Sequence, residues 1–327
     1  MIPYGRHFID EEDIQAVVTA LRSDWLTTGP RIEEFEKGIC GFTGAKFGVA
    51  VASGTAGLHV AMYGAGLGPG DEVIVPPLTF VATANAALYL GATPVFADID
   101  PDTFLADPEK VEAKITAKTK AIVVVDYAGQ PCDYQRFRDI AKRHNLLLIA
   151  DACHAIGGSY RGQSVGTLAD LSVLSFHPVK HLTTGEGGMV LTNSEPMAAR
   201  MKLFRNHGIS SDHRQRAASG AWHYEMVDLG YNYRICDFQC ALGISQLKKL
   251  PQFLERRREI AKKYDESFVN FPNLRPLLKR DDCEHAYHLY PIRIDFAALG
   301  KEKKDVFAAL KAAGIYVVVH YPPLHLH

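Results

Sequence analysis

A carboxylate and a lysine stand at the ends of two apolar segments, where parallel sheets collect the groups that bind ligands. Asp151 closes the predicted strand Leu146–Asp151, and Lys180 follows the predicted strand Leu171–Ser175. A lysine amine forms imines with aldehydes, and a carboxylate can keep the ring nitrogen of a pyridine-type cofactor protonated. Taken separately, Asp151 could cap a helix and Lys180 could lie on the surface. Together they predict a site for imine chemistry.

A turn of small residues supplies a candidate anion site. The stretch Ser53–Ala56 leads from an apolar strand into a helix, where backbone N–H groups lack partners and the helix dipole is positive. Such turns are common, and an ordinary tight turn capped by Thr55 explains the segment equally well when it is considered alone. Phe80 is also open to two interpretations, as a core side chain or as a ring that stacks on a ligand.

Short apolar runs alternate with amphipathic segments over the first half of the chain. Because the runs are continuously apolar, they indicate a parallel sheet that is buried on both faces and joined by right-handed helical crossovers. The predicted strands are Gly48–Ala52, Glu72–Val75, Pro94–Ile99, Ala121–Asp126 and Leu146–Asp151, and the helices between them include Ala56–Leu67 and Tyr134–His144. The fold class is therefore α/β.

The pattern changes near Gln246 and predicts a second, smaller domain. A charged amphipathic helix over Leu254–Phe268 precedes His288–Asp295, which alternates like a half-buried strand. A lysine-rich helix over Lys301–Ala313 and a β-branched strand over Ile315–Val319 follow. We predict a large α/β domain over residues 1–248 and a small α+β domain over residues 249–327.

The overall composition excludes several classes of protein. The 327 residues are 47% hydrophobic and carry a formal net charge of -1, so no global field recruits nucleic acid or an anionic membrane. No apolar run is long enough to span a bilayer, and the start lacks a signal peptide, so we place the protein in the cytoplasm. Six cysteines and fourteen histidines show neither disulfide nor metal-ligand spacing, and we expect no metal site.

Five motifs, in order, resemble the fold type I enzymes that use pyridoxal 5'-phosphate (PLP), and specifically their sugar aminotransferase branch, the DegT/StrS family. The motifs are Ser-Gly-Thr-Ala at 53–56, Thr-Phe-Val-Ala-Thr-Ala-Asn at 79–85, Asp-Ala-x-His at 151–154, Ser-Phe-His-x-x-Lys at 175–180 and Gly-Tyr-Asn-Tyr-Arg at 230–234. The likeness extends from about Tyr4 to His320. It implies a three-layer α/β/α fold with a mainly parallel sheet.

The resemblance implies a role for each matching residue. Lys180 becomes the Schiff-base lysine and proton shuttle, Asp151 the partner of the pyridine nitrogen, and His154 the residue beside the ring. The other implied cofactor contacts are Thr55, Ala56, Phe80, Ser175 and, reaching in from a partner subunit, Asn232. A homodimer with shared sites is therefore implied.

The residue at position 180 also favours one reaction within the family. Dehydratase members carry histidine where aminotransferases carry lysine, and this sequence has Lys180. The implied reaction is transamination, in which L-glutamate leaves its amine on the cofactor as pyridoxamine 5'-phosphate and a keto-sugar accepts it. A regulator that keeps the fold without turnover is the rival from another class, although it would be expected to have lost Lys180 or Asp151.

The implied substrate is a nucleotide-linked keto-sugar. Trp25, Thr28, His320 and Tyr321 lie where the family contacts it, although a turn and a strand end also explain these segments. The segments most resemble the pseudaminic acid branch, which aminates C4 of a UDP-4-keto-6-deoxy-N-acetyl-L-hexosamine. A GDP- or dTDP-keto-sugar aminated at C3 or C4 is the alternative. Because family members continue well past this stretch, we expect the small domain to be incomplete at His327.

Overall fold

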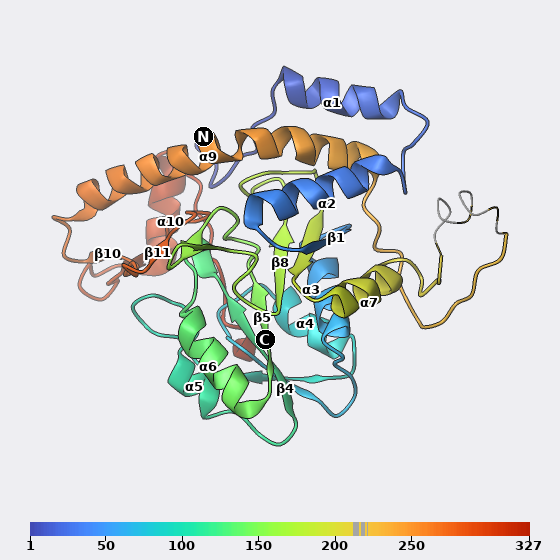
Figure 1. The fold of residues 1–327 in the computed structure, drawn as a ribbon. Helices are drawn as coiled ribbons and strands as arrows, with labels where there is room; N and C mark the ends of the chain where they lie inside the picture. The colour runs from blue at the N-terminus through green and yellow to red at the C-terminus, as the bar shows by residue number, and fades with distance from the viewer. Residues whose placement is uncertain (212–215, 217–219, 221) are drawn as a thin grey trace.

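A seven-stranded sheet forms the centre of the computed structural model, which describes residues 1–211, 216, 220 and 222–327 (Figure 1). The strand order is β1-β9-β8-β5-β4-β2-β3. The strands are β1 Phe47–Val51, β2 Glu72–Val75, β3 Thr93–Phe96, β4 Thr119–Val125, β5 Leu147–Asp151, β8 Leu171–Ser175 and β9 Gly188–Thr192. Only β9 among these runs antiparallel to its neighbours, which confirms the predicted mainly parallel sheet.

Helices cover both faces of this sheet, as the continuously apolar strands require. Alternate residues of β4 show why: Ile122 and Val124 face one apolar core, and Ala121 and Val123 face the other. The first core is closed by α2 Pro30–Thr43, α6 Tyr134–His144 and α9 Asp237–Phe268, and the second by α3 Gly54–Gly64, α4 Ala82–Leu88 and α7 Glu195–Arg205. The result is the expected three-layer α/β/α arrangement.

The long helix α9 connects the sheet to the C-terminal part of the chain. It begins at Asp237, earlier than the predicted start at Leu254, and α1 Glu11–Leu21 lies along its outer side (Figure 1). Lys249 of α9 pairs with Asp10 and Asp13 at the start of α1. The predicted division at residue 248 falls inside this continuous helix, so it stays a prediction.

The C-terminal part of the chain, after α9, contains the short strands β10 Leu274–Pro276, β11 Cys283–Glu284 and β12 Ile292–Ile294, the helix α10 Lys303–Ala312 and the turn η2 Leu324–Leu326. The remaining short elements, which precede α9, are α5 Pro108–Glu112, η1 Tyr127–Gly129, β6 Ser159–Tyr160 and β7 Gln163–Ser164. The predicted strand over Ile315–Val319 is wrong, because its only ladder contact is a bridge from Ile315 to Ile2. A β-branched run needs a neighbouring strand to pair with, and none of the described residues provides one there.

The predicted half-buried strand His288–Asp295 is reduced to β12. Pro291 has no N–H to donate to a ladder, and the residues before it bond instead to the turn at Ala128 and Gly129. Among the described residues, no helix combines the length and the apolar character needed to cross a membrane.

Candidate active site

A cavity of about 510 Å³ opens at the carboxyl ends of β5 and β8. Parallel strands place their final residues along one edge of the sheet, so side chains that are far apart in sequence converge there. Eight of the predicted site residues line this cavity: Thr55, Phe80, Asp151, His154, Ser175, Lys180, His320 and Tyr321. Its volume is that of a typical small-ligand site.

Asp151 presents a buried carboxylate to the cavity. Its side chain is only 6% exposed, and one oxygen accepts a hydrogen bond of 2.7 Å from the Thr83 hydroxyl while the other accepts one of 3.3 Å from the Cys153 backbone N–H. Asp151 forms no ion pair with another described residue. A buried carboxylate is costly without a positive partner, so this group suits a ligand that carries a protonated ring nitrogen.

Lys180 lies in the loop that joins β8 to β9 and points its amine into the same cavity. Burial lowers the pKa of Lys180, while the nearby Cys153 and Asp151 oppose that shift. Its Nζ lies 3.4 Å from Nε2 of His288. A lysine amine with a lowered pKa is more often neutral, and therefore able to attack an aldehyde.

The start of α3 forms a close-fitting cradle at the other end of the cavity. The hydroxyl of Ser53 caps the helix by accepting from the Ala56 N–H at 3.1 Å, which leaves Gly54 and Thr55 at the tip. A Cβ on Gly54 would lie only 3.0 Å from the Cβ of Ser175. The backbone, the serine hydroxyl and the positive helix end together suit a phosphate group.

Aromatic side chains form the remaining wall. The Tyr321 hydroxyl lies 3.2 Å from Nε2 of His154, and the ring of Phe80 lies 5.9 Å from the ring of Tyr321. Tyr127 donates a hydrogen bond to the carbonyl of His320 and so holds that segment against the end of β4. Burial lowers the pKa of His154 far below its usual range, so its imidazole is neutral.

Four predicted residues lie away from the cavity lining. Ala56 lies behind the helix tip, with its N–H bonded to Ser53. Trp25 and Thr28 lie in the segment that docks on the start of α9, where Asp237 accepts from the Gly29 N–H at 2.8 Å. Asn232 is exposed, and its backbone pairs with that of Asn206 in an isolated antiparallel β-bridge. Their roles stay predictions.

His288 is a cavity residue that the sequence reasoning missed. It is only 8% exposed and lines the cavity beside Lys180. In the sequence it was assigned to a half-buried strand, where a histidine attracts no attention. No local signal marks it, because the backbone turns through a left-handed residue at Tyr287 and so breaks the two-residue alternation of a strand.

The chemistry of the cavity defines the class of protein. Among the described residues, no group of three or more His, Cys, Asp or Glu side chains could hold a metal ion. The amine, the carboxylate and the phosphate cradle instead match the aldehyde, the ring nitrogen and the phosphate of PLP. The fold and the site are those of a PLP-dependent enzyme of fold type I.

Comparisons with known proteins identify the family. A model described as the DegT/DnrJ/EryC1/StrS aminotransferase family matches residues 7–327. The spore coat polysaccharide biosynthesis protein SpsC of Bacillus subtilis (strain 168) is 42% identical over 328 residues, which cover 100% of this chain and 84% of SpsC. The chain belongs to the DegT/DnrJ/EryC1/StrS aminotransferase family.

Solved structures agree with this assignment. The putative sugar aminotransferase Spr1654 from Streptococcus pneumoniae, in its PMP form, is 35% identical with a TM-score of 0.94, over 100% of this chain and 87% of that chain. The same protein has also been solved in a PLP form. Helicobacter pylori PseC, an aminotransferase involved in the biosynthesis of pseudoaminic acid, is 38% identical with a TM-score of 0.91, over 99% of this chain and 85% of that chain. This protein is a PLP-dependent aminotransferase.

Proposed function

We propose that this enzyme transfers the amino group of L-glutamate to C4 of a UDP-4-keto-6-deoxy-N-acetyl-L-hexosamine. The transfer converts glutamate to 2-oxoglutarate and the keto-sugar to an amino sugar. The observation that carries the proposal is that Lys180, Asp151 and the His320–Tyr321 segment line the same cavity. The groups for amine transfer therefore lie next to the residues that are predicted to contact the sugar. The 38% identity to PseC supports the choice of sugar.

Four groups of this chain would hold the cofactor. Asp151, fixed by the Thr83 hydroxyl, would face the ring nitrogen, and His154 would lie beside the ring. The tip of α3 and Ser175 would take the phosphate. When bound, PLP supplies an aldehyde that captures amines and a ring that stores the electron pair released at the substrate carbon.

Lys180 performs the proton transfer. Its amine, whose pKa burial lowers, removes the proton from the α-carbon of the amino donor and returns a proton to the sugar carbon in the second half of the cycle. Burial lowers the pKa of His154 well below its usual range, so its imidazole is too weak a base to compete with Lys180 for this proton. Phe80 and Tyr321 line the same cavity, and their rings would limit the access of water to the reacting atoms once the cavity is filled.

A shared-site homodimer is the second part of the proposal. Tyr89 and Tyr231 are 52% and 37% exposed and pack against the buried His59, with ring centroids 5.3 and 5.0 Å away. Leu88 beside them is 55% exposed. A joined apolar patch of this kind suits a protein interface, and the exposed Asn232 next to Tyr231 would then reach the phosphate in the partner's cavity.

The substrate is tested by product analysis. Purified enzyme with PLP and ¹⁵N-labelled glutamate is incubated with the UDP-4-keto sugar, and mass spectrometry follows the label. We expect a ¹⁵N amino sugar with wild type and none with Lys180→Ala. Label that enters only a dTDP- or GDP-keto-sugar would overturn the choice of nucleotide. The structural neighbour DesI, solved with its TDP-sugar product at 33% identity, makes that the second candidate.

The same assay separates the other functions. A dehydratase would release a sugar that has lost a hydroxyl and carries no label. A regulator would bind the cofactor without consuming glutamate. The dimer is tested by mixing Lys180→Ala and Asn232→Ala chains, because shared sites predict one intact site per mixed dimer and unshared sites predict none.

A further inference from the structure

His288 contacts the amine of Lys180 inside the cavity that also contains Asp151. Its Nε2 lies 3.4 Å from Nζ of Lys180, and its ring centroid lies 4.4 Å from that of His154. No other described side chain forms a hydrogen bond with the lysine amine. His288 is therefore the group that decides how the free amine is held.

The backbone around His288 is fixed by hydrogen bonds to the turn η1 and to His181. Ala286 and Leu289 donate their N–H groups to the carbonyls of Gly129 and Ala128, at 2.8 and 3.1 Å. His181 contacts the carbonyl of Ala286 at 2.9 Å. Such a network leaves the imidazole of His288 little freedom to move away from Lys180.

The helix α9 adds a cationic anchor to the same segment. Arg257 donates through Nη1 to the carbonyls of Tyr287 and His288, at 3.1 and 3.2 Å. Arg257 has no carboxylate within ion-pair distance among the described residues. Its guanidinium therefore acts on the backbone that carries His288, and its charge lies near Lys180.

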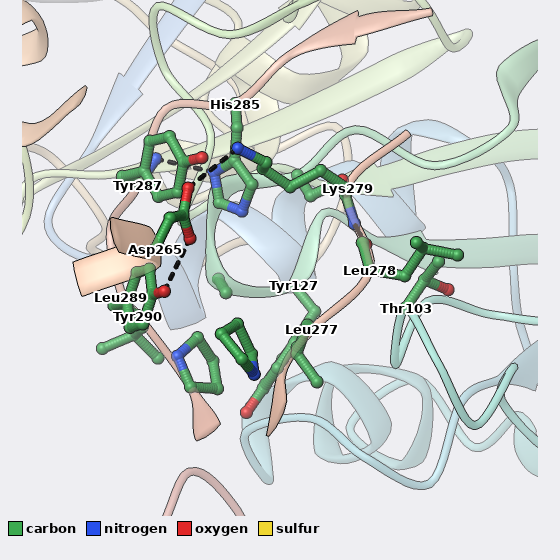
Figure 2. Close-up of a pocket in the computed structure, with 14 residues that line it drawn as sticks. Thr103, Tyr127, Asp265, Leu277, Leu278, Lys279, His285, Tyr287, Leu289 and Tyr290 are labelled. Atoms are coloured by element: carbon green, nitrogen blue, oxygen red, sulfur yellow. Dashed lines mark hydrogen bonds and ion pairs between the residues drawn. The ribbon is translucent and has the colours of Figure 1, made fainter. Parts of the chain in front are cut away.

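The other face of the segment packs against a separate, small cavity (Figure 2). His285 and Tyr287 stack there with ring centroids 4.0 Å apart, and Asp265 accepts hydrogen bonds from Lys279 at 3.0 Å and from Tyr290 at 2.6 Å. His285 and Tyr287 contact this network, and a left-handed backbone turn at Tyr287 (φ 51°) carries the chain on to His288 in the active site. Both faces fix the position of its ring.

The environment of the ring indicates which nitrogen carries the proton. Nδ1 of His288 is buried and has no hydrogen-bond partner. A buried N–H without an acceptor is rarer than a buried acceptor without a donor, so the proton belongs on Nε2, which faces Lys180. An Nε2–H can only donate to the lone pair of an uncharged lysine amine.

We propose that His288 is a positioning residue that donates its Nε2–H to the neutral amine of Lys180 whenever that amine is free. The hydrogen bond aims the amine into the cavity and stabilises its uncharged form, which is the form that accepts a proton from substrate. The inference rests on the proposed role of Lys180. It assigns to His288, a residue from the C-terminal part of the chain, a role in positioning the catalytic base Lys180.

The charges around the pair agree with this state. Burial lowers the pKa of His288 well below its usual range, and the charge of Arg257 lowers it further, so the imidazole stays neutral. The titratable and charged groups that face the pair are Asp151, Cys153, His154, His181, Arg257 and His320. Two of these, Asp151 and Cys153, favour the ammonium form of Lys180 and oppose the hydrogen bond from His288.

The test measures the titration of Lys180 directly. The cofactor-free, full-length chain is labelled with trace acetic anhydride at several pH values, and peptide mass spectrometry reports the neutral fraction of Lys180. The exposed Lys118 serves as the internal control. His288→Phe fills the space without a donor, and His288→Gln retains an N–H donor.

If His288 donates to the neutral amine, removing this donor should raise the pH at which Lys180 becomes labelled. His288→Phe should raise the labelling midpoint of Lys180 by about one pH unit, a tenfold loss of neutral amine, and His288→Gln should restore most of it. A downward shift would mean that His288 accepts from an ammonium, and no shift would mean that it only fills space; either result overturns the proposal. His288→Met is the second donor-free variant should the Phe variant not fold. Because no sugar is used, failure of the proposed substrate would leave this result unaffected.

Discussion

Replacement of Asp126 by asparagine should make the protein more stable, and increasingly so as the pH rises. Asp126 follows β4 directly, is fully buried, and donates its backbone N–H to the carbonyl of Asp151 at 3.1 Å. Burial raises the pKa of its carboxyl from 3.8 to about 7, and the charge of Asp151 adds to the shift. Its oxygens accept from the Cys132 N–H at 2.9 Å and from the Tyr134 hydroxyl at 2.8 Å.

The sign and the size follow from proton linkage. Between about pH 4 and pH 7 the unfolded chain has released the Asp126 proton and the folded chain retains it, so this group lowers the free energy of unfolding as the pH rises. The loss is absent below about pH 4, grows between pH 4 and pH 7, and levels off above pH 7 at no more than about 4 kcal/mol, from roughly 1.4 kcal/mol per unit. Asparagine cannot ionise, so Asp126→Asn removes this penalty.

The assay is urea unfolding of both proteins at several pH values from 4.5 to 8. We expect the difference in unfolding free energy to grow in favour of Asp126→Asn up to about pH 7 and to stay constant above it. Asp126→Leu is the matched control, because it also removes the charge but leaves the Tyr134 hydroxyl and the Cys132 N–H without partners. A difference that is independent of pH would refute the reasoning.

Three further predictions concern the cradle, the carboxylate and the N-terminal helix. Thr83→Val removes the hydroxyl that orients Asp151 and should weaken PLP binding about tenfold, measured by fluorescence titration. Gly54→Ala places a methyl group against the phosphate cradle and should weaken PLP binding by a similar factor in the same titration. Lys249→Met leaves the buried Asp13 without its cation and should cost about 3 kcal/mol, seen as faster hydrogen exchange in α1.

Each of these has a matched control within the chain. Thr83→Ser keeps the hydroxyl and should restore PLP affinity. Gly41→Ala, also in a helix but with nothing within 4 Å of the added methyl, should leave PLP affinity unchanged. Lys249→Arg keeps the cation and should protect α1. Equal effects of a variant and its control would contradict the corresponding prediction.

Elements with strong local patterns were predictable from the sequence. The helix Tyr134–His144 and the strand Leu171–Ser175 have their predicted bounds, because a capping aspartate, an amphipathic spacing and an apolar run define them locally. Strand β9 was not predicted, because it returns directly beside β8 without the intervening helix that marks a parallel crossover. The run Ile315–Val319 was predicted as a strand because β propensity says nothing about whether a partner strand exists.

The residues of the candidate site also divide into those that the sequence could predict and those that it could not. Lys180 and Asp151 were accessible to sequence reasoning, because residues at strand ends are known to converge. His288 was not, because its place beside Lys180 depends on hydrogen bonds to Gly129 and on Arg257 of α9, which are long-range contacts. Such contacts leave no local pattern in the chain.

The most direct test of the central claim is whether Lys180 carries the cofactor and releases it to glutamate. The PLP-reconstituted protein is reduced with borohydride before and after the addition of glutamate, and peptide mass spectrometry locates the retained pyridoxyl group. We expect the group on Lys180 before glutamate and its loss afterwards, with no retention in Lys180→Ala. Labelling of a different lysine, or labelling that glutamate does not change, would contradict the account.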